Sequence, residues 1–170
     1  MASVREDLYR LEPLGHHDRH GFSCGVESLD SYLKNQASQD IRRKADAVFV
    51  LVPSDELTTI AGYFTLCAYG LSSGTIPEAA QKHTPRYPVV SATLIGRLAV
   101  SKGRQGKGLG SVLLAQALHK AFENSSVVGS SMVVVDAIDD RAVRFYEAYG
   151  FVKLHGSMRL VLPIRLIAKL

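Results

Sequence analysis

A glycine-rich stretch in the middle of the chain is the first place where residue types and spacing could do chemistry. Residues 104–110 read R-Q-G-K-G-L-G, and an apolar segment with helical spacing follows directly. Glycine lets the backbone turn sharply and approach a ligand, and the start of a helix offers unpaired N–H groups and the positive end of a dipole. The stretch therefore predicts a site for an anion such as a phosphate group.

The spacing of the glycines excludes two common kinds of phosphate-binding loop. A nucleoside-triphosphate loop needs G-x-x-x-x-G-K-[ST], but Gly108 is followed by Leu109 and Gly110. A dinucleotide loop needs G-x-G-x-x-G, and the interval from Gly108 to Gly110 is too short for it. The anion must therefore belong to another class of ligand.

A second candidate stretch lies further along the chain, where residues 144–151 read R-F-Y-E-A-Y-G-F. Asp139 or Asp140 is placed to cap a helix that runs to Tyr149, and Gly150 is placed to end it. Tyrosine hydroxyls can transfer protons, and aromatic residues at this spacing can also simply pack in a core. The residues alone leave both interpretations open.

The elements that must position these two stretches alternate along the chain. Helices are expected at 28–42, 78–82, 109–122 and 139–149. Strands are expected at 9–14, 47–52, 60–71, 93–100, 132–137, 151–154 and 158–164. The strands at 47–52 and 60–71 should form a hairpin, and the continuous apolar run at 132–137 should be covered on both faces. This alternation predicts an α/β protein with a mixed sheet.

Length and composition limit the classes of protein to consider. The 170 residues fit a single domain spanning 1–170, and no apolar run approaches the roughly 20 residues that cross a bilayer. We therefore expect a cytoplasmic protein that binds no membrane. Cys24 and Cys67 lack metal-ligand spacing, so no metal is expected.

The distribution of charge is more informative than the net charge of +4. Residues 1–60 contain 7 Lys and Arg against 10 Asp and Glu, whereas residues 61–170 contain 13 against 6. A cationic half that includes the glycine-rich stretch fits a polyanionic ligand, and an ordinary basic surface is the alternative.

The two stretches together resemble the GNAT acetyltransferases. Gln105-x-x-Gly108-x-Gly110, after the strand R-L-A-V, is similar to the acetyl-CoA pyrophosphate signature of that family. R-F-Y-E-A-Y-G-F, after a strand ending in V-D-A, is similar to its second hallmark. The resemblance implies the GNAT fold, with a mixed central sheet of about six to seven strands and helices on both faces.

The resemblance also implies roles for individual residues. The main chain around the end of the strand would hold the pantetheine and the acetyl carbonyl, and the N–H groups from Gln105 to Ser111 would take the pyrophosphate. Tyr146 would be the general acid that protonates the departing thiolate, the one catalytic residue assigned. The cofactor-binding residues implied are Leu98, Ala99, Val100, Arg104, Gln105, Gly106, Lys107, Gly108, Leu109, Gly110, Ser111, Asp139 and Phe145.

A general base is not evident in the sequence. His119 and His155 lie away from the expected amine site, Asp136 is more suited to a strand-end hydrogen bond, and His16, His17 and His20 are typical of a solvated turn. An α-amino group has a pKa of about 7.7–8.0 against about 10.4 for lysine, so part of it is already neutral at pH 7. The missing base therefore favours an α-amine as acceptor.

Further segments resemble the TacT/AtaT-type toxins of bacterial type II toxin–antitoxin systems: F-S-C-G-V-E-S-L-D-S-Y-L, G-Y-F-T-L and the closing R-L-V-L-P-I. This resemblance implies acetylation of the α-amine of aminoacyl-tRNA, inhibition of translation, a homodimer and neutralisation by a ribbon-helix-helix antitoxin. A GNAT enzyme that acetylates a small-molecule amine or a protein N-terminus is the alternative. The candidate tRNA contacts are Arg42, Arg43, Lys82, Arg86 and Arg97, where an ordinary surface charge is the alternative.

Overall fold

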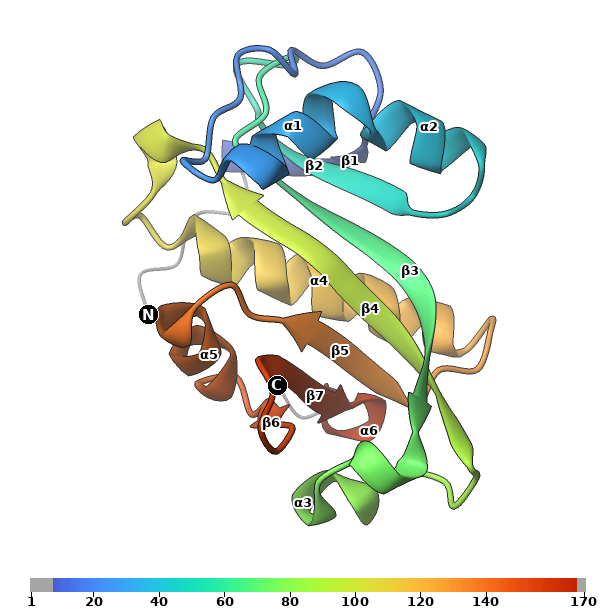
Figure 1. The fold of residues 1–170 in the computed structure, drawn as a ribbon. Helices are drawn as coiled ribbons and strands as arrows, with labels where there is room; N and C mark the ends of the chain where they lie inside the picture. The colour runs from blue at the N-terminus through green and yellow to red at the C-terminus, as the bar shows by residue number, and fades with distance from the viewer. Residues whose placement is uncertain (1–7, 168–170) are drawn as a thin grey trace. The chain divides into compact units, whose positions relative to one another are not determined.

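The structure, a computed structural model, describes residues 8–167. Its strands follow the hydrogen-bonded order β1-β2-β3-β4-β5-β7-β6 (Figure 1). β4 and β5 are parallel, whereas β1 with β2, β2 with β3, β5 with β7 and β6 with β7 are antiparallel. The predicted mixed sheet of about six to seven strands is confirmed.

The bounds of the elements follow the predicted order closely. The strands are β1 (Tyr9–Pro13), β2 (Ala47–Pro53), β3 (Gly62–Ser72), β4 (Val89–Val100), β5 (Met132–Asp136), β6 (Val152–Lys153) and β7 (Arg159–Pro163). The helices are α1 (Glu27–Asn35), α2 (Ala37–Arg42), α3 (Glu78–Gln81), α4 (Leu109–Ser125), α5 (Asp140–Glu147) and α6 (Ile164–Ile167), with short 3₁₀ turns η2 (Ser73–Thr75) and η3 (Lys102–Arg104).

The chain divides into two compact units, each with its own apolar core. The first contains the described residues up to Leu66 together with Arg97–Ala117, and the second contains Cys67–Gly96 and the described residues from Leu118 onward. The glycine-rich stretch belongs to the first unit and Tyr146 to the second. That the whole chain forms one functional domain remains a prediction.

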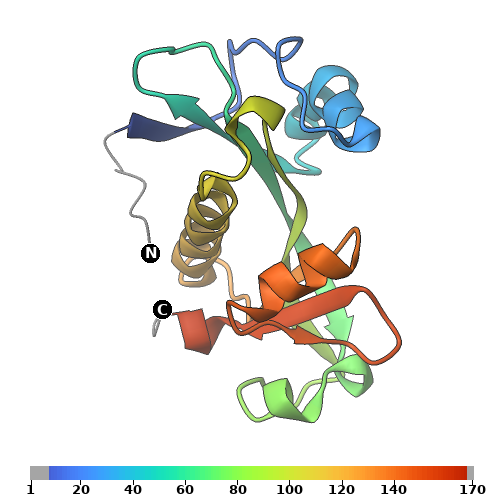
Figure 2. The ribbon, with the colours of Figure 1, turned by 90° about the vertical axis from the view of Figure 1, so that its left-hand side faces the viewer.

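Helices cover both faces of the strands in the first unit. Val48, Val50 and Val52 alternate along β2 and pack in one cluster with Leu33 of α1 and Tyr63 of β3. On the opposite face, a Cβ at Gly62 would lie 2.5 Å from Leu113 of α4. Figure 2 accordingly shows α1 and α2 on one side of the strands and α4 on the other.

The second unit is organised around β5. Met132 and Val134 pack with Leu71, Ile76 and Val161 in one cluster. Val133 and Val135, which alternate with them, are also fully buried. β5 is thus covered on both faces, as its continuous apolar sequence predicts.

Three elements differ from the sequence prediction. The helix expected at 28–42 breaks at Gln36 (φ −121°), where the weak helix former Asn35 precedes a turn that begins α2. β4 begins at Val89, directly after Pro88, rather than at residue 93. The closing strand ends at Pro163, and Ile164 begins the short helix α6.

Replacement of Gly62 by alanine should destabilise the protein. The added Cβ would lie 2.9 Å from the carbonyl oxygen of Ala99, a backbone atom that cannot rotate away. We expect the free energy of unfolding to fall by about 1–3 kcal/mol, measured by urea denaturation. Gly74→Ala is the control, because nothing lies within 4 Å of a Cβ there. Equal effects of the two changes would contradict this account of the packing.

Candidate functional site

The glycine-rich stretch forms a loop whose backbone is free to bind a ligand. Gly106 (φ 77°) and Gly108 (φ 82°) adopt left-handed conformations that side chains disfavour. Among the described residues, no acceptor pairs with the N–H groups of Gly106, Lys107 or Gly108. The next three N–H groups, up to Ser111, form the first turn of α4, where a helix has no internal acceptor. This run of free N–H groups fits the diphosphate of a coenzyme.

In the described residues, β5 pairs with only part of β4, the strand that leads into the loop. The parallel pairing of β4 with β5 ends at Ile95↔Val135. The segment from Leu98 to Val100 therefore extends beyond the part of β4 that β5 covers. Ala99 is buried in the core of the first unit, while Leu98 and Val100 are half-buried. Main-chain groups along this edge can hydrogen-bond an extended ligand as a neighbouring strand would.

The side chain of Gln105 fastens the loop to the segment before α1. Its Nε2 donates hydrogen bonds of 2.9 Å to the carbonyl oxygens of Cys24 and Val100. Beside it, the N–H of Lys102 donates to the carbonyl oxygen of Ser23 at 2.8 Å. The N–H of Gln105 itself is paired with the carbonyl of Lys102, so the free run starts at Gly106, one residue later than predicted. We therefore interpret Gln105 as a clasp for the loop.

The two cations of the loop differ in their surroundings. Arg104 donates to the Tyr9 hydroxyl at 3.2 Å and lies 3.6 Å from a carboxylate oxygen of Glu56. Lys107 is exposed and has no partner among the described residues. Lys107 is thus the cation that is free to meet an anion at this loop, and Arg104 is chiefly engaged with the protein.

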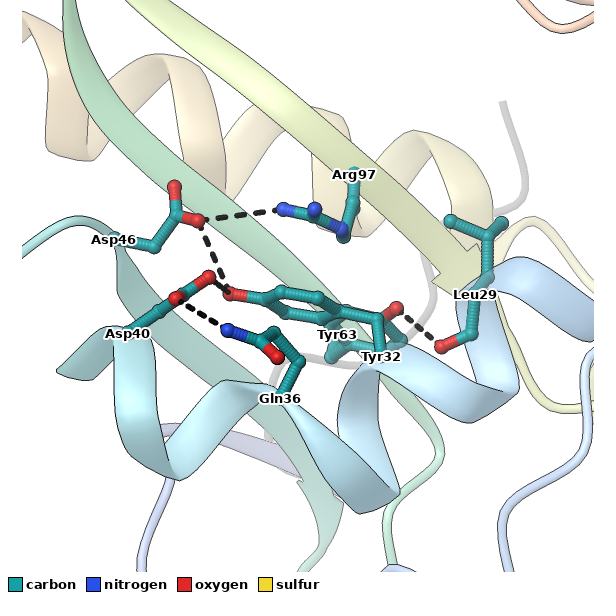
Figure 3. A network of polar contacts seen from close by, with 7 residues as sticks. All are labelled: Leu29, Tyr32, Gln36, Asp40, Asp46, Tyr63 and Arg97. Carbon is teal, nitrogen blue, oxygen red and sulfur yellow. Dashed lines mark hydrogen bonds and ion pairs between the residues drawn. The ribbon is translucent and has the colours of Figure 1, made fainter.

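Arg97 takes part in a polar network between β4 and the helices α1 and α2 (Figure 3). Its guanidinium carbon lies 3.4 Å from the centroid of the Tyr32 ring, and its Nη1 lies 3.3 Å from Asp46. The Tyr32 hydroxyl is 3.0 Å from carboxylate oxygens of both Asp40 and Asp46. An arginine in an otherwise apolar strand needs such partners.

The two carboxyl groups of this network have different pKa values. Burial raises the pKa of Asp46 although Tyr32 and Arg97 act against the shift. The pKa of Asp40 is lowered, chiefly by a hydrogen bond from the side chain of Gln36. Arg97 is 31% exposed at its side chain, so part of its guanidinium remains accessible.

Tyr146 lies on α5, in the second unit. Asp139 caps this helix by accepting a hydrogen bond of 2.7 Å from the N–H of Ala142. The Tyr146 ring contacts the rings of Phe145 and Phe151, with centroids 5.3 and 5.6 Å apart. Its hydroxyl has no hydrogen-bond partner within residues 8–167. Burial, followed by the carboxylate of Asp136, raises the pKa of Tyr146 to about 12, so the phenol carries its proton at neutral pH.

The remaining predicted cations are at the surface. Arg42 and Arg43 lie at the end of α2 in the first unit, and Lys82 and Arg86 follow α3 in the second. All four are exposed. Arg42, Lys82 and Arg86 have no ion-pair partner in the described part of the chain. They are therefore available to an anionic partner.

Comparison with known proteins decides the family. The profile of the Acetyltransferase (GNAT) family matches residues 12–151, most of the chain. The chain belongs to this family. It is an acetyltransferase.

Three relatives narrow the comparison. The acetyltransferase is 29% identical to the "Probable toxin TacT" of Sinorhizobium fredii, over 100% of this chain and 99% of the relative. It is 28% identical to AtaT complexed with acetyl-methionyl-tRNAfMet, with a TM-score of 0.86 over 95% of this chain and 98% of that one. A tyrosine-to-phenylalanine variant of AtaT, bound to the C-terminus of the antitoxin AtaR and to acetyl-CoA, matches with 25% identity and a TM-score of 0.80 over 95% and 96% of the two chains.

Two side-chain contacts of the acetyltransferase bear on the sequence predictions. Asp136 accepts a hydrogen bond from Arg159, in keeping with the predicted strand-end hydrogen bond, whereas the contact of His17 Nε2 with Oε2 of Glu12, at 2.9 Å, was not foreseen. The side chain of His17 is only 6% exposed, so the solvated turn predicted around it is wrong for this histidine. Pairing with a carboxylate explains how it can be buried.

The described part of the acetyltransferase was also searched for metal sites and for membrane-spanning helices. No group of three or more His, Cys, Asp or Glu side chains in residues 8–167 is arranged to hold a metal ion. No helix in the same range combines the length and apolar character needed to cross a membrane.

Loss of the Gln105 side chain should weaken acetyl-CoA binding. Gln105→Ala removes both hydrogen bonds that hold the loop, so its N–H groups are less well ordered before binding. We expect the Kd for acetyl-CoA, measured by calorimetry, to rise about tenfold, which corresponds to about 1.4 kcal/mol. Gln116→Ala, on the following helix, is the control for loss of a glutamine. An unchanged Kd in Gln105→Ala would contradict the role of a clasp.

Proposed function

We propose that this acetyltransferase transfers the acetyl group of acetyl-CoA to the α-amino group of an amino acid carried by tRNA, and so inhibits translation. The observation that carries the proposal is the likeness over nearly the whole chain to AtaT complexed with acetyl-methionyl-tRNAfMet. An acetylated α-nitrogen is an amide and no longer a nucleophile. Such a tRNA cannot accept a growing peptide, which explains how the reaction would stop translation.

The backbone supplies the binding of the donor in this proposal. The free N–H groups from Gly106 to Ser111, with the exposed Lys107, bind the pyrophosphate of acetyl-CoA. The open edge of β4 at Leu98–Val100 binds the pantetheine and orients the thioester carbonyl. Because these are main-chain groups, the donor site is largely fixed before the ligand arrives.

The reaction balances with Tyr146 as the proton donor. The neutral amine attacks the thioester carbonyl, a C–N bond forms and the C–S bond breaks. Tyr146 gives its hydroxyl proton to the leaving sulfur, so that coenzyme A departs as a thiol. The proton released from the attacking nitrogen passes through solvent and restores the phenol. The raised pKa keeps Tyr146 in the protonated form that this step requires.

An α-amino group suits a site without a dedicated base. With a pKa of about 7.7–8.0, a useful fraction of such amines is neutral near pH 7, whereas a lysine amine is almost wholly charged. The reaction should therefore accelerate as pH rises from 6 to 8 and then level off, as the acceptor amine loses its proton.

Exposed cations provide contacts for the phosphates of tRNA. Arg42, Lys82 and Arg86 are exposed and unpaired within the described residues, and Arg43 lies beside Arg42. Arg97 is a weaker candidate, because Asp46 already neutralises part of its charge.

The proposal extends to partners and place of action. An antitoxin, of the ribbon-helix-helix type, holds the enzyme inactive, in keeping with the complex of AtaT and AtaR. The enzyme acts in the cytoplasm, where charged tRNA is found, and as a homodimer it would offer tRNA two sets of cations.

Replacement of Tyr146 by phenylalanine tests the chemistry. The change removes the transferable proton and keeps the ring packing, so kcat for acetylation of total charged tRNA should fall about a hundredfold or more. Binding of acetyl-CoA should be unchanged, and growth arrest on expression should be relieved. Tyr149→Phe is the control, a half-buried tyrosine of the same segment. Labelled acetyl groups found only on small amines or protein N-termini would refute the tRNA substrate.

Charge reversal after α3 tests the tRNA surface. Lys82→Glu with Arg86→Glu should weaken binding of charged tRNA, and the slope of log affinity against log salt should shrink by about 0.7–0.9 for each phosphate that the variant no longer neutralises. Lys153→Glu, an exposed lysine of the same unit, should leave the slope unchanged. Equal weakening in the two variants would indicate an effect of net charge alone.

A further inference from the structure

An exposed aromatic ring lies on the segment that connects α3 to β4 (Figure 1). Tyr87 is 66% exposed, and the next most exposed aromatic residue of the described chain, Phe122, is at 36%. The side chain of Tyr87 makes no ring contact and no hydrogen bond within residues 8–167. Val89, the first residue of β4, is 64% exposed. Two large apolar side chains within three residues are thus left in contact with water.

The segment that carries Tyr87 is held in place by prolines and a hydrogen bond. Pro85 and Pro88 flank Arg86 and Tyr87, and each proline fixes its own φ and restricts the residue before it. The carbonyl oxygen of Pro88 accepts a hydrogen bond of 3.0 Å from the N–H of Ser73. A ring on such a stiff segment loses little conformational entropy when it binds a ligand.

Unpaired cations accompany the exposed ring. Residues 67–96 contain two basic side chains, Lys82 and Arg86, against one carboxylate, that of Glu78. Both cations are exposed, and neither has an ion-pair partner in the described chain. Arg86 directly precedes Tyr87, and Lys82 ends α3. A flat ring beside free cations fits a ligand that carries both negative charge and flat apolar groups.

Nucleic acid combines these two properties, because its phosphates carry the charge and its bases have flat faces. A base within a double helix is stacked between its neighbours, so its face is not available to a protein side chain. Unpaired bases, such as those in the loops and at the 3′ end of tRNA, can stack on an aromatic ring. A protein partner could also cover the ring, but two unpaired cations favour a polyanion.

We propose that Tyr87 stacks on an unpaired base of the tRNA while Arg86 and Lys82 contact neighbouring phosphates. The inference rests on the proposed function, because it takes tRNA as the substrate. It adds a contact with a base, which cations that bind phosphates do not provide. Stacking tolerates any base, so this contact selects single-stranded structure rather than a particular nucleotide.

Salt dependence separates the stacking contact from the phosphate contacts. Tyr87→Ala should raise the Kd for charged tRNA about tenfold and leave the slope of log affinity against log salt unchanged, because no phosphate contact is lost. Tyr87→Phe keeps the ring and should bind within about twofold of the unaltered enzyme. Val127→Ala, which truncates a residue of the same unit that is 82% exposed, is the control.

Tryptophan fluorescence gives a readout that needs no acetylation. The chain contains no tryptophan, so Tyr87→Trp places a single indole in the protein. Stacking on a base quenches indole emission. The emission should fall on addition of uncharged tRNA or of a single-stranded RNA of about ten nucleotides, within the usual range of site sizes. A blunt-ended RNA duplex of the same length should leave it nearly unchanged.

Three results would overturn the inference. An unchanged Kd for charged tRNA in Tyr87→Ala would show that the ring contacts no base. Equal quenching by duplex and single strand would show that the indole responds to nearby RNA without stacking. Loss of binding to a protein partner in Tyr87→Ala, with tRNA binding intact, would assign the ring to that partner. If single-stranded RNA quenches Tyr87→Trp but the enzyme acetylates no charged tRNA, the proposed substrate fails and the RNA contact stands.

Discussion

A buried or ordered backbone N–H group needs an acceptor, and the run from Gly106 to Ser111 finds none in the described chain. The surrounding contacts keep this run in place. Ser101 donates to the carbonyl of Ala61 at 2.9 Å, Lys102 donates to Ser23, and the Gln105 side chain binds two further carbonyls. Hydrogen bonds thus hold the loop immediately before its free N–H groups begin. A bound ligand can then supply the acceptors for these groups.

Both units stabilise an arginine within a strand in the same way. Arg97 and Arg159 each stand in a largely apolar strand, where an unpaired cation would be costly. Each pairs with an aspartate and lies against a tyrosine ring, Tyr32 in the first unit and Tyr69 in the second. The two networks differ in their balance of charged groups. The network of Arg97 contains two carboxyl groups, whereas that of Arg159 contains one.

The sequence indicated what depends on local spacing. Apolar periodicity predicted β2, β3, β5 and α4 within a few residues, and the interval from Gln105 to Gly110 separated the loop from the nucleotide-binding types. The sequence did not predict contacts between residues that are distant along the chain. Nothing local marks Arg159 as the partner of Asp136, because that pairing depends on the register of β5 against β7. The same holds for Gln105 and Cys24, which meet only when the segment before α1 lies along the loop. The break at Gln36 was missed because the apolar spacing of Leu29, Tyr32, Leu33 and Ala37 continues across it.

The clasp on Cys24 also bears on how the enzyme withstands oxidants. Cys24 is 8% exposed, and burial, followed by the neighbouring Asp30, raises the pKa of its thiol to about 11. Oxidants attack the thiolate, and a thiol with this pKa is almost wholly protonated in a neutral medium. The residue whose carbonyl anchors the loop is therefore chemically quiet. Peroxide inactivates many enzymes by oxidising a reactive cysteine, and Cys24 is not a reactive cysteine of this kind.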